Sequence, residues 1–145
     1  MCILGDAKKT IMNKIIPVLF AAFLVSVSGF SQDTLEIEIT GLRNNTGTIM
    51  LQLFDEHETV IRQEKGVILE NKCSIIIKDL YPGKYAVRYF HDENLNGTLG
   101  TTKIGKPTEG YGFSNNAYGM FGPKPFKDWL FEVKEDTKLI LKTKY

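Results

Sequence analysis

The sequence predicts an all-β protein whose seven strands form a two-layer antiparallel sandwich. Apolar and polar residues alternate with a period of two in several short segments, and turn residues separate these segments at short intervals. After the N-terminal segment, no stretch has the apolar spacing of an amphipathic helix. Short strands divided by turns favour a sandwich. A small barrel is the competing topology, because periodicity does not distinguish a closed sheet from two stacked sheets.

Each expected strand rests on a local pattern. In TLEIEITG, Leu35, Ile37 and Ile39 lie on one face and polar residues on the other. In the YPGK turn, Pro82 presets φ and Gly83 tolerates the positive φ of a type II turn, so a strand ends before it and another begins after it. The ranges expected as strands are 34–41, 47–55, 64–70, 73–80, 84–92, 128–133 and 137–144.

One long irregular loop interrupts this pattern. Residues 94–127 have almost no periodicity and contain seven glycines and three prolines, which favour turns over strands. A loop of this length in a small domain usually carries function or is disordered. We therefore look for functional residues in this loop and beside it.

The first 31 residues have the composition of a signal peptide. Lys8, Lys9 and Lys14 precede the uncharged apolar run IIPVLFAAFLVSVSGF, which is short for a helix that spans a membrane. An uncleaved membrane anchor is the competing interpretation. The pattern predicts an exported protein, either periplasmic or secreted.

Small residues near the end of the apolar run place the expected cleavage after Ser31, with a cut after Ser28 as the alternative. Met12 is an alternative initiator. The predicted organisation is a signal peptide over residues 1–31 and a single β-sandwich domain over residues 32–145, with no membrane span after cleavage.

Net charge and cysteine content give expectations about nucleic-acid binding and disulfide formation. Removing residues 1–31 leaves 15 basic and 16 acidic side chains, a balance that gives no electrostatic reason for nucleic-acid binding. Of the two cysteines, Cys2 leaves with the signal and Cys73 remains alone, so no internal disulfide is expected. Cys73 alternates with isoleucines and is interpreted as a buried apolar residue, not a reactive thiol.

The segment HDENLNGTLG contains the first half of a calcium-loop pattern. Oxygen ligands at alternate positions converge on one ion, and a glycine permits the sharp bend between them. The expected metal ligands are Asp92, Asn94, Asn96 and the carbonyl of Thr98.

The second half of the calcium pattern does not follow. Position 12 is Lys103, where an EF-hand requires a bidentate glutamate. A further carboxylate would have to come from Glu93, Glu109 or Asp128. The competing interpretation is an Asx-turn hairpin that binds nothing. No cofactor is firmly predicted, and weakly bound calcium is the cofactor that the sequence leaves open.

The stretch 109–129 is rich in aromatic residues set among glycines, asparagines and prolines. Flat rings beside amide groups suit the binding of a sugar or a peptide. The competing interpretation is an Ω-loop whose rings cover an open end of the sandwich. The candidate ligand-binding residues are Tyr111, Phe113, Asn115, Asn116, Tyr118 and Phe121.

Enzymatic interpretations have less support. His91 stands beside Asp92, but no Ser or Cys has a nucleophile pattern around it, and neighbouring strand residues point to opposite faces. We predict no catalytic residues and no enzyme activity, with a secreted hydrolase that uses His91 and Asp92 as the weakest alternative.

Two stretches resemble a known family. DLYPGKYAVRYFHDENLNG is similar to the L-x-P-G-x-Y-x-V hairpin and Asp/Asn loop of transthyretin-like and Cna-B-like modules, which include regulatory domains of carboxypeptidases. Together with GKPTEGYGFSNNAYGMFGPKPFKDWLFEV it resembles a bacterial secreted family, domain of unknown function 2141 (DUF2141), over roughly residues 35–143. The resemblance implies a prealbumin-like (transthyretin-like) sandwich in a signal-bearing bacterial protein of uncharacterised function.

The predicted function is an exported binding or accessory module that recognises a ligand or partner through its 91–129 loops. A glycan or a cell-envelope protein is the expected partner. The alternative is a structural protein of the cell envelope with no small-molecule ligand.

Overall fold

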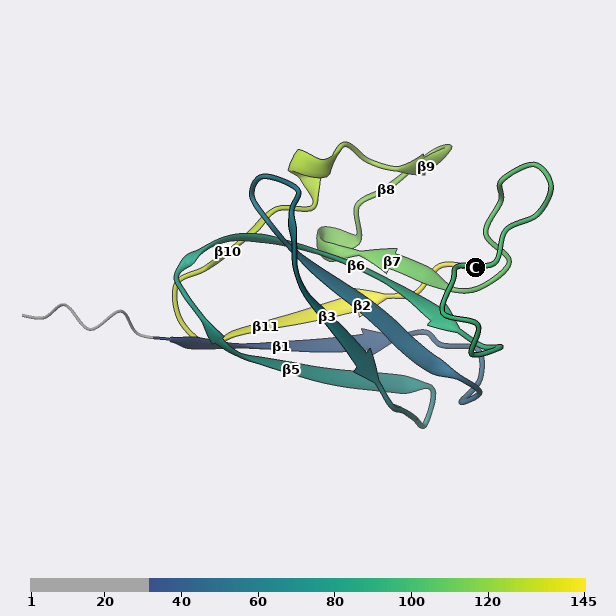
Figure 1. The fold of residues 1–145 in the computed structure, drawn as a ribbon, viewed down its shortest axis with the longest axis horizontal. Coiled ribbons are helices and arrows are strands. Elements are labelled where there is room, and N and C mark those ends of the chain that lie inside the picture. The colour runs from purple at the N-terminus through teal and green to yellow at the C-terminus, as the bar shows by residue number, and fades with distance from the viewer. Residues whose placement is uncertain (1–31) are drawn as a thin grey trace, which may run out of the picture.

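Residues 32–145 form two stacked β-sheets in the computed structural model, which describes this part of the chain (Figure 1). The predicted signal peptide, its cleavage site and Met12 lie outside the described residues. Within residues 32–145, no helix is both long enough and apolar enough to cross a bilayer. The all-β prediction is confirmed for this part of the chain.

The first sheet has the strand order β11-β1-β5-β4. Its central pair, β1 and β5, is antiparallel, with Ile37 opposite Ile75 and Ile39 opposite Cys73. These residues therefore share the buried face of the sheet. The strands are β1 (Asp33–Thr40), β4 (Ile68–Leu69), β5 (Lys72–Leu80) and β11 (Thr137–Lys142).

The second sheet has the strand order β10-β6-β2-β3, and β7 also pairs with β6. β10 and β7 lie end to end along the same edge of β6, opposite Gly83–Tyr85 and Arg88–Phe90 respectively. The strands are β2 (Thr48–Asp55), β3 (Val60–Gly66), β6 (Gly83–Asp92), β7 (Tyr111–Phe113) and β10 (Phe131–Val133).

Two features of the predicted fold are corrected. β11 runs parallel to β1, with Leu35 opposite Thr137 and Thr40 opposite Lys142, so the sandwich is not wholly antiparallel. The described residues contain eleven strand segments instead of seven. Alternation of apolar residues reports which face of a strand is buried and nothing about the direction of its neighbours.

The expected loop over residues 94–127 also contains more structure than predicted. β7 is followed by a short 3₁₀ turn η1 (Ser114–Asn116), the hairpin β8 (Tyr118–Gly119) and β9 (Gly122–Pro123), and a second 3₁₀ turn η2 (Phe126–Asp128). These elements are only two or three residues long. A segment that short cannot display a period, which is why the sequence pattern missed them.

The main core lies between the two sheets. Alternate residues of β1 and β5 meet alternate residues of β2 and β6, and Leu35, Ile37, Ile49 and Leu53 have no exposed surface. All members of this core and of the smaller second cluster lie between residues 35 and 141. Within the described residues, the two sheets thus bury a hydrophobic core between them.

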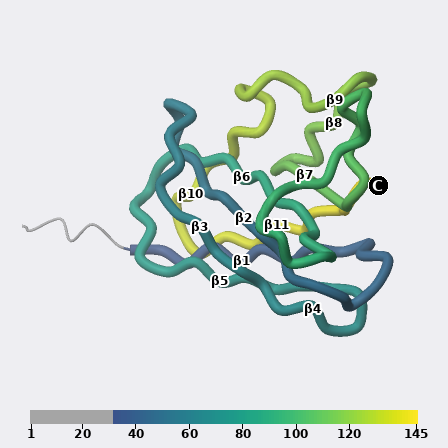
Figure 2. The backbone as a smooth tube through the Cα atoms, turned by 45° about the vertical axis from the view of Figure 1, so that its right-hand side comes forward, coloured from purple at the N-terminus to yellow at the C-terminus, as the bar shows by residue number. Residues whose placement is uncertain are grey.

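Two projections extend from the same end of the sandwich. One is the loop of residues 101–107, and the other is the hairpin of residues 118–123; we call them the first and second finger. Figure 2 shows the two fingers close together on the side of the molecule opposite β4. The outer face of the second sheet, below the fingers, carries the candidate site.

Candidate functional site

An aromatic cap covers part of the outer face of the second sheet. It is formed by Phe54, Ala86, Phe113, Ala117 and Trp129, which make a hydrophobic cluster separate from the main core. The rings of Trp129 and Phe113 lie 4.4 Å apart between centroids. The Trp129 Nε1–H donates to the Lys124 carbonyl at 2.9 Å, so the indole anchors the chain that leads into it.

Ser114 joins this cap to the sheet. Its Oγ accepts a hydrogen bond from the Val87 N–H at 2.9 Å and donates to the Trp129 carbonyl at 2.6 Å. Val87 lies between the part of β6 that pairs with β10 and the part that pairs with β7. Neither β10 nor β7 pairs with Val87 on this edge of β6, and the buried Ser114 hydroxyl bonds the Val87 N–H there instead.

The predicted ligand residues Asn115, Asn116 and Tyr118 have their polar groups in internal hydrogen bonds. Asn115 donates to the carbonyls of Asp128 and Leu130, and Asn116 Oδ1 accepts from the Lys142 N–H. Both asparagines have positive φ, a conformation that Asn tolerates better than most residues.

The Tyr118 hydroxyl lies 2.6 Å from the Lys142 carbonyl and 3.0 Å from the Tyr111 carbonyl. Burial raises the pKa of Tyr118 to about 12. These contacts are those of the Ω-loop interpretation, in which the loop residues hold the loop together.

Tyr111, Phe113 and Phe121 have a different environment. Tyr111 and Phe113 line two neighbouring cavities on the outer face of the second sheet, and Phe121 lines one of them. The Phe121 side chain is 98% exposed at the tip of the second finger. The predicted ligand set therefore divides into three residues that pin the loop and three that border open space.

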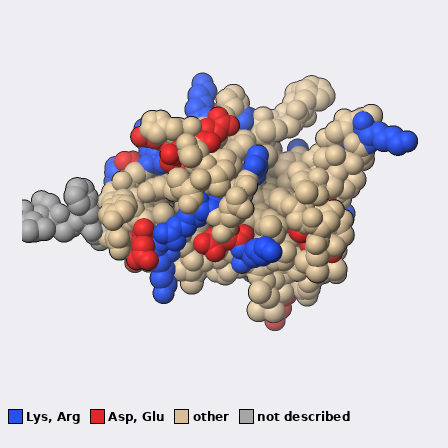
Figure 3. Space-filling model, viewed as in Figure 1, with Lys and Arg blue, Asp and Glu red and all other residues tan. Residues whose placement is uncertain are grey.

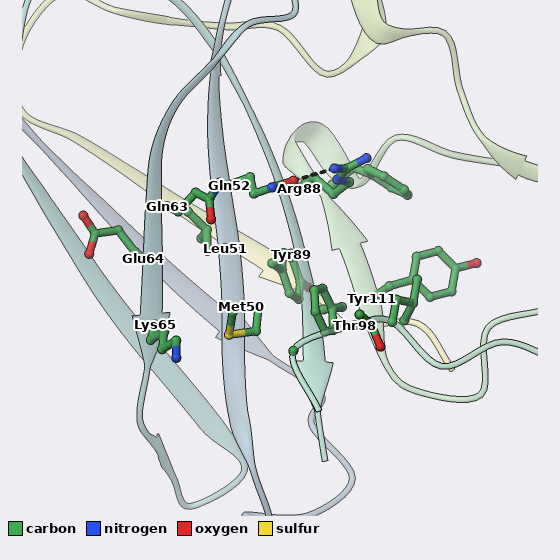
Figure 4. A pocket seen from close by; sticks show the side chains of 14 residues that line it. Met50, Leu51, Gln52, Gln63, Glu64, Lys65, Arg88, Tyr89, Thr98 and Tyr111 are labelled. Carbon is green, nitrogen blue, oxygen red and sulfur yellow. Dashed lines mark hydrogen bonds between the residues drawn. The ribbon is translucent and has the colours of Figure 1, made fainter. Parts of the chain in front are cut away.

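The first cavity has a volume of about 490 Å³ and lies over β2, β3 and β6. Its floor comes from outward-facing strand residues, including Met50, Gln52 and Phe90, and its wall from the loop around Leu99. Figure 4 shows Gln63 and Lys65 of β3 along one side and Thr98 and Tyr111 along the other.

The second cavity has a volume of about 720 Å³ and lies between the two fingers. It shares Arg88, Leu99, Tyr111 and Phe113 with the first cavity, so the two cavities adjoin, and together we call them the outer groove. The charged side chains that line the second cavity are Arg88, Lys106 and Lys144, and none of its described lining residues is acidic.

Arg88 occupies the junction of the outer groove. Its guanidinium donates to Gln52 Oε1 (Figure 4). It also lies 5.4 Å from the centre of the Phe54 ring. These contacts hold the charged group at the surface of the sheet, where Arg88 lines both cavities. A fixed guanidinium beside aromatic walls can bind a carboxylate, sulfate or phosphate group on an otherwise apolar ligand.

Sequence reasoning missed Met50, Gln52 and Arg88 as groove residues. They alternate with core residues on their strands, which marks them as outward-facing. Gln52 and Arg88 become neighbours only through the β2–β6 register, which pairs them directly. The period-two pattern could therefore have predicted that these side chains are exposed. It could not have predicted that Gln52 and Arg88 lie side by side.

The loop after β6 is organised by Asp92, which is 2% exposed. One carboxylate oxygen accepts from the Asn96 N–H at 3.1 Å and the other from the Gly97 N–H at 2.8 Å. Asn94 Oδ1 accepts from the Asn96 N–H as well, and Asn96 Oδ1 accepts from Thr98. The four predicted metal-site residues thus lie in one tight loop and bond to its backbone.

Glu109 closes this loop from outside. It is 5% exposed, and its two oxygens accept from the backbone N–H groups of Glu93 and Gly100 at 3.0 and 2.9 Å. Glu109 is one of the three residues that the sequence left open as the source of a further carboxylate ligand for calcium. Among residues 32–145, no three His, Cys, Asp or Glu side chains form a group suited to hold a metal ion.

We expect Asp92→Asn to lower the free energy of unfolding by about 1–2 kcal/mol, because one buried loop N–H loses its acceptor. Urea unfolding measures this, with the exposed Asp79→Asn as a charge-matched control. If Asp92 also ligates calcium, millimolar calcium will raise the unfolding midpoint of the wild type and not of Asp92→Asn. An unchanged wild-type midpoint would contradict the calcium prediction.

His91 lies in the core, on the face of β6 opposite Asp92. Its side chain is fully buried, its Nε2–H donates to the Thr46 carbonyl at 2.6 Å, and its Nδ1 lies 2.8 Å from the Tyr145 hydroxyl. Both ring nitrogens are therefore engaged away from solvent. This geometry gives no support to the alternative of a hydrolase based on His91 and Asp92.

Arg43 and Glu93 form an ion pair beside this histidine. The Arg43 guanidinium bonds both Glu93 oxygens, at 2.7 and 2.8 Å, and stacks over the Tyr145 ring at 4.5 Å. The hydrogen bond from Arg43 lowers the pKa of the Glu93 carboxyl below its ordinary value, and the same pairing raises the pKa of Arg43.

Cys73 is 2% exposed and belongs to the main core. Burial raises the pKa of its thiol to about 11. A thiol of that pKa stays protonated near neutral pH and is a poor nucleophile. The interpretation of Cys73 as a buried apolar residue is confirmed.

The fold and the groove define a class: an all-β sandwich domain with a loop-bordered groove on one outer face. More particularly, the chain belongs to the family described as uncharacterized protein conserved in bacteria (DUF2141), whose sequence profile matches residues 37–140. No curated protein and no solved structure matches the chain.

Proposed function

We propose that this protein is an exported, non-enzymatic binding module that holds an elongated ligand with an anionic group in the outer groove. In this proposal the signal peptide is removed on export to the periplasm or the medium. The two-sheet domain is a transthyretin-like sandwich whose second sheet presents the groove.

The placement of Arg88 is the observation that carries the proposal. The guanidinium stands where the two cavities meet, and it is held there by Gln52 and the Phe54 ring. The cavity volumes are within the range of small-molecule sites. Tyr111 and Phe113 supply apolar walls, and Lys106 and Lys144 add positive charge toward the fingers.

Binding of anilinonaphthalene sulfonate, an apolar anion, tests the proposal. We expect its fluorescence to rise with folded wild type and its affinity to fall about ten-fold in Arg88→Met, which keeps the stem and loses a charged donor. Lys84→Met, on the same strand but outside the groove lining, should bind the dye like wild type. Equal affinity in Arg88→Met, with unchanged unfolding midpoints, would contradict the proposal.

Displacement of the dye then identifies the ligand class. Acidic oligosaccharides, neutral oligosaccharides and fatty acids are added in turn, and an acidic glycan is the expected competitor. If none of them displaces the dye, and capture from an envelope extract returns one defined protein, the alternative of a structural cell-envelope protein is favoured.

A further inference from the structure

The fingertips carry apolar side chains that are almost fully exposed. Phe121 is 98% exposed, and Met120 and Ile104 are each 89% exposed, which makes them the three most exposed large hydrophobic residues that the structure describes. All three line the second cavity, so the tips face a common space. Their exposure has no explanation in the stability of the fold.

Hydrogen bonds within each finger hold these tips away from the domain. In the first finger, the Thr102 N–H donates to the Lys106 carbonyl at 2.8 Å and the Gly105 N–H to the Thr102 carbonyl at 2.9 Å. In the second finger, β8 pairs with β9, and the Lys124 N–H donates to the Ala117 carbonyl at 2.9 Å. The projections are thus ordered by their backbones and not by burial of their tips.

The charge around the tips is of one sign. The two fingers, residues 101–107 and 118–123, contain two lysines, Lys103 and Lys106, and no Asp or Glu, and Lys124 directly follows the second finger. All three lysines are exposed. Figure 3 shows the projecting ends of the molecule in tan and blue on the face in view.

We propose that the two fingers dock the protein onto an anionic lipid surface. Ile104, Met120 and Phe121 enter the boundary between headgroups and acyl chains, and the lysines beside them contact anionic headgroups. A bilayer is the partner that this arrangement favours, because separate apolar tips need no complementary hollow in a fluid surface. Single apolar side chains flanked by lysines match the composition of segments that bind at the membrane interface.

Sedimentation of residues 32–145 with vesicles tests this proposal. Wild type should bind vesicles of phosphatidylglycerol and phosphatidylcholine in equal parts, bind pure phosphatidylcholine far less, and lose binding as salt is added. A Met120→Ser, Phe121→Ser double variant should bind the anionic vesicles at least about ten-fold more weakly. The reason is that binding then no longer removes two apolar side chains from water. Lys103→Glu with Lys106→Glu should weaken binding by a similar factor.

Val67→Ser is the matched control for the apolar tips. Val67 is 76% exposed and directly precedes β4, a strand on the side of the molecule away from the fingers (Figure 2), and its replacement should leave vesicle binding unchanged. A Phe121→Trp variant adds a direct readout, because insertion should shift its emission to the blue, whereas Trp129 is already buried.

Three results would overturn the proposal. The first is wild type that stays in the supernatant with anionic vesicles. The second is a serine double variant that binds like wild type while its unfolding midpoint is unchanged. The third is self-association of wild type that the serine substitutions abolish without any vesicle binding, which would assign the tips to a second copy of the chain. The fingertip residues also line the second cavity of the outer groove, but vesicle sedimentation of wild type and the dye titration of Arg88→Met are separate readouts, so either proposal can fail alone.

Discussion

Ser114→Ala is expected to lower the free energy of unfolding by about 2–3 kcal/mol, a large loss for removing one oxygen atom. The hydroxyl is fully buried and serves two backbone groups, the Val87 N–H and the Trp129 carbonyl. Alanine fits the space but leaves both groups without a partner in a site away from water. Chemical denaturation with urea, monitored by circular dichroism, measures the change.

Ser74→Ala provides the comparison for this prediction. Ser74 is an exposed strand residue of β5, and its replacement should change stability by less than about 0.5 kcal/mol. If Ser114→Ala proved as mild as Ser74→Ala, the hydroxyl would not be the link between the aromatic cap and β6.

Trp129→Ala is expected to cost about 3–5 kcal/mol, the range for removing a large buried aromatic side chain. Trp129 packs against Phe113, Phe54 and Phe126, and its Nε1–H anchors the Lys124 carbonyl. Because Trp129 and Phe113 also border the second cavity, the variant should lose dye binding in the outer groove together with stability. Thermal unfolding and the dye titration measure the two effects.

Phe121→Ala separates the two roles of aromatic residues in this segment. It removes a ring from the same stretch, but at a position that is 98% exposed, so stability should change by less than about 0.5 kcal/mol. Equal destabilisation by Trp129→Ala and Phe121→Ala would contradict the division between a buried cap and exposed fingertips.

Much of the fold could be predicted because buried strands carry their pattern locally. Leu35, Ile37 and Ile39 alternate with polar residues whatever their neighbours are, and the structure buries all three. The parallel partner of β1 could not be predicted in this way, since β11 lies about a hundred residues away and its own alternation is the same in either direction.

Some of the predicted ligand residues line the outer groove, and others do not. Tyr111 and Phe113 do border the outer groove, whereas the polar groups of Asn115 and Asn116 bond to the backbone of their own domain. The sequence alone does not distinguish an asparagine that binds a ligand from one that holds a loop in place. Arg88 was overlooked because its role depends on the neighbouring strand and on a loop that folds back over it.

The parallel pairing of β1 with β11 also has a kinetic consequence. β1 can pair with β5 early, but it finds its parallel neighbour β11 only after nearly all the intervening chain has been made, and such distant pairings slow folding. A chain that crosses a membrane unfolded, as proposed here, would gain from that delay, because it stays unfolded until the final strand emerges. A circular permutant should therefore refold faster if its added linker, of about a dozen residues, crosses from the end of β11 back to the start of β1, and stopped-flow fluorescence of Trp129 would record the change.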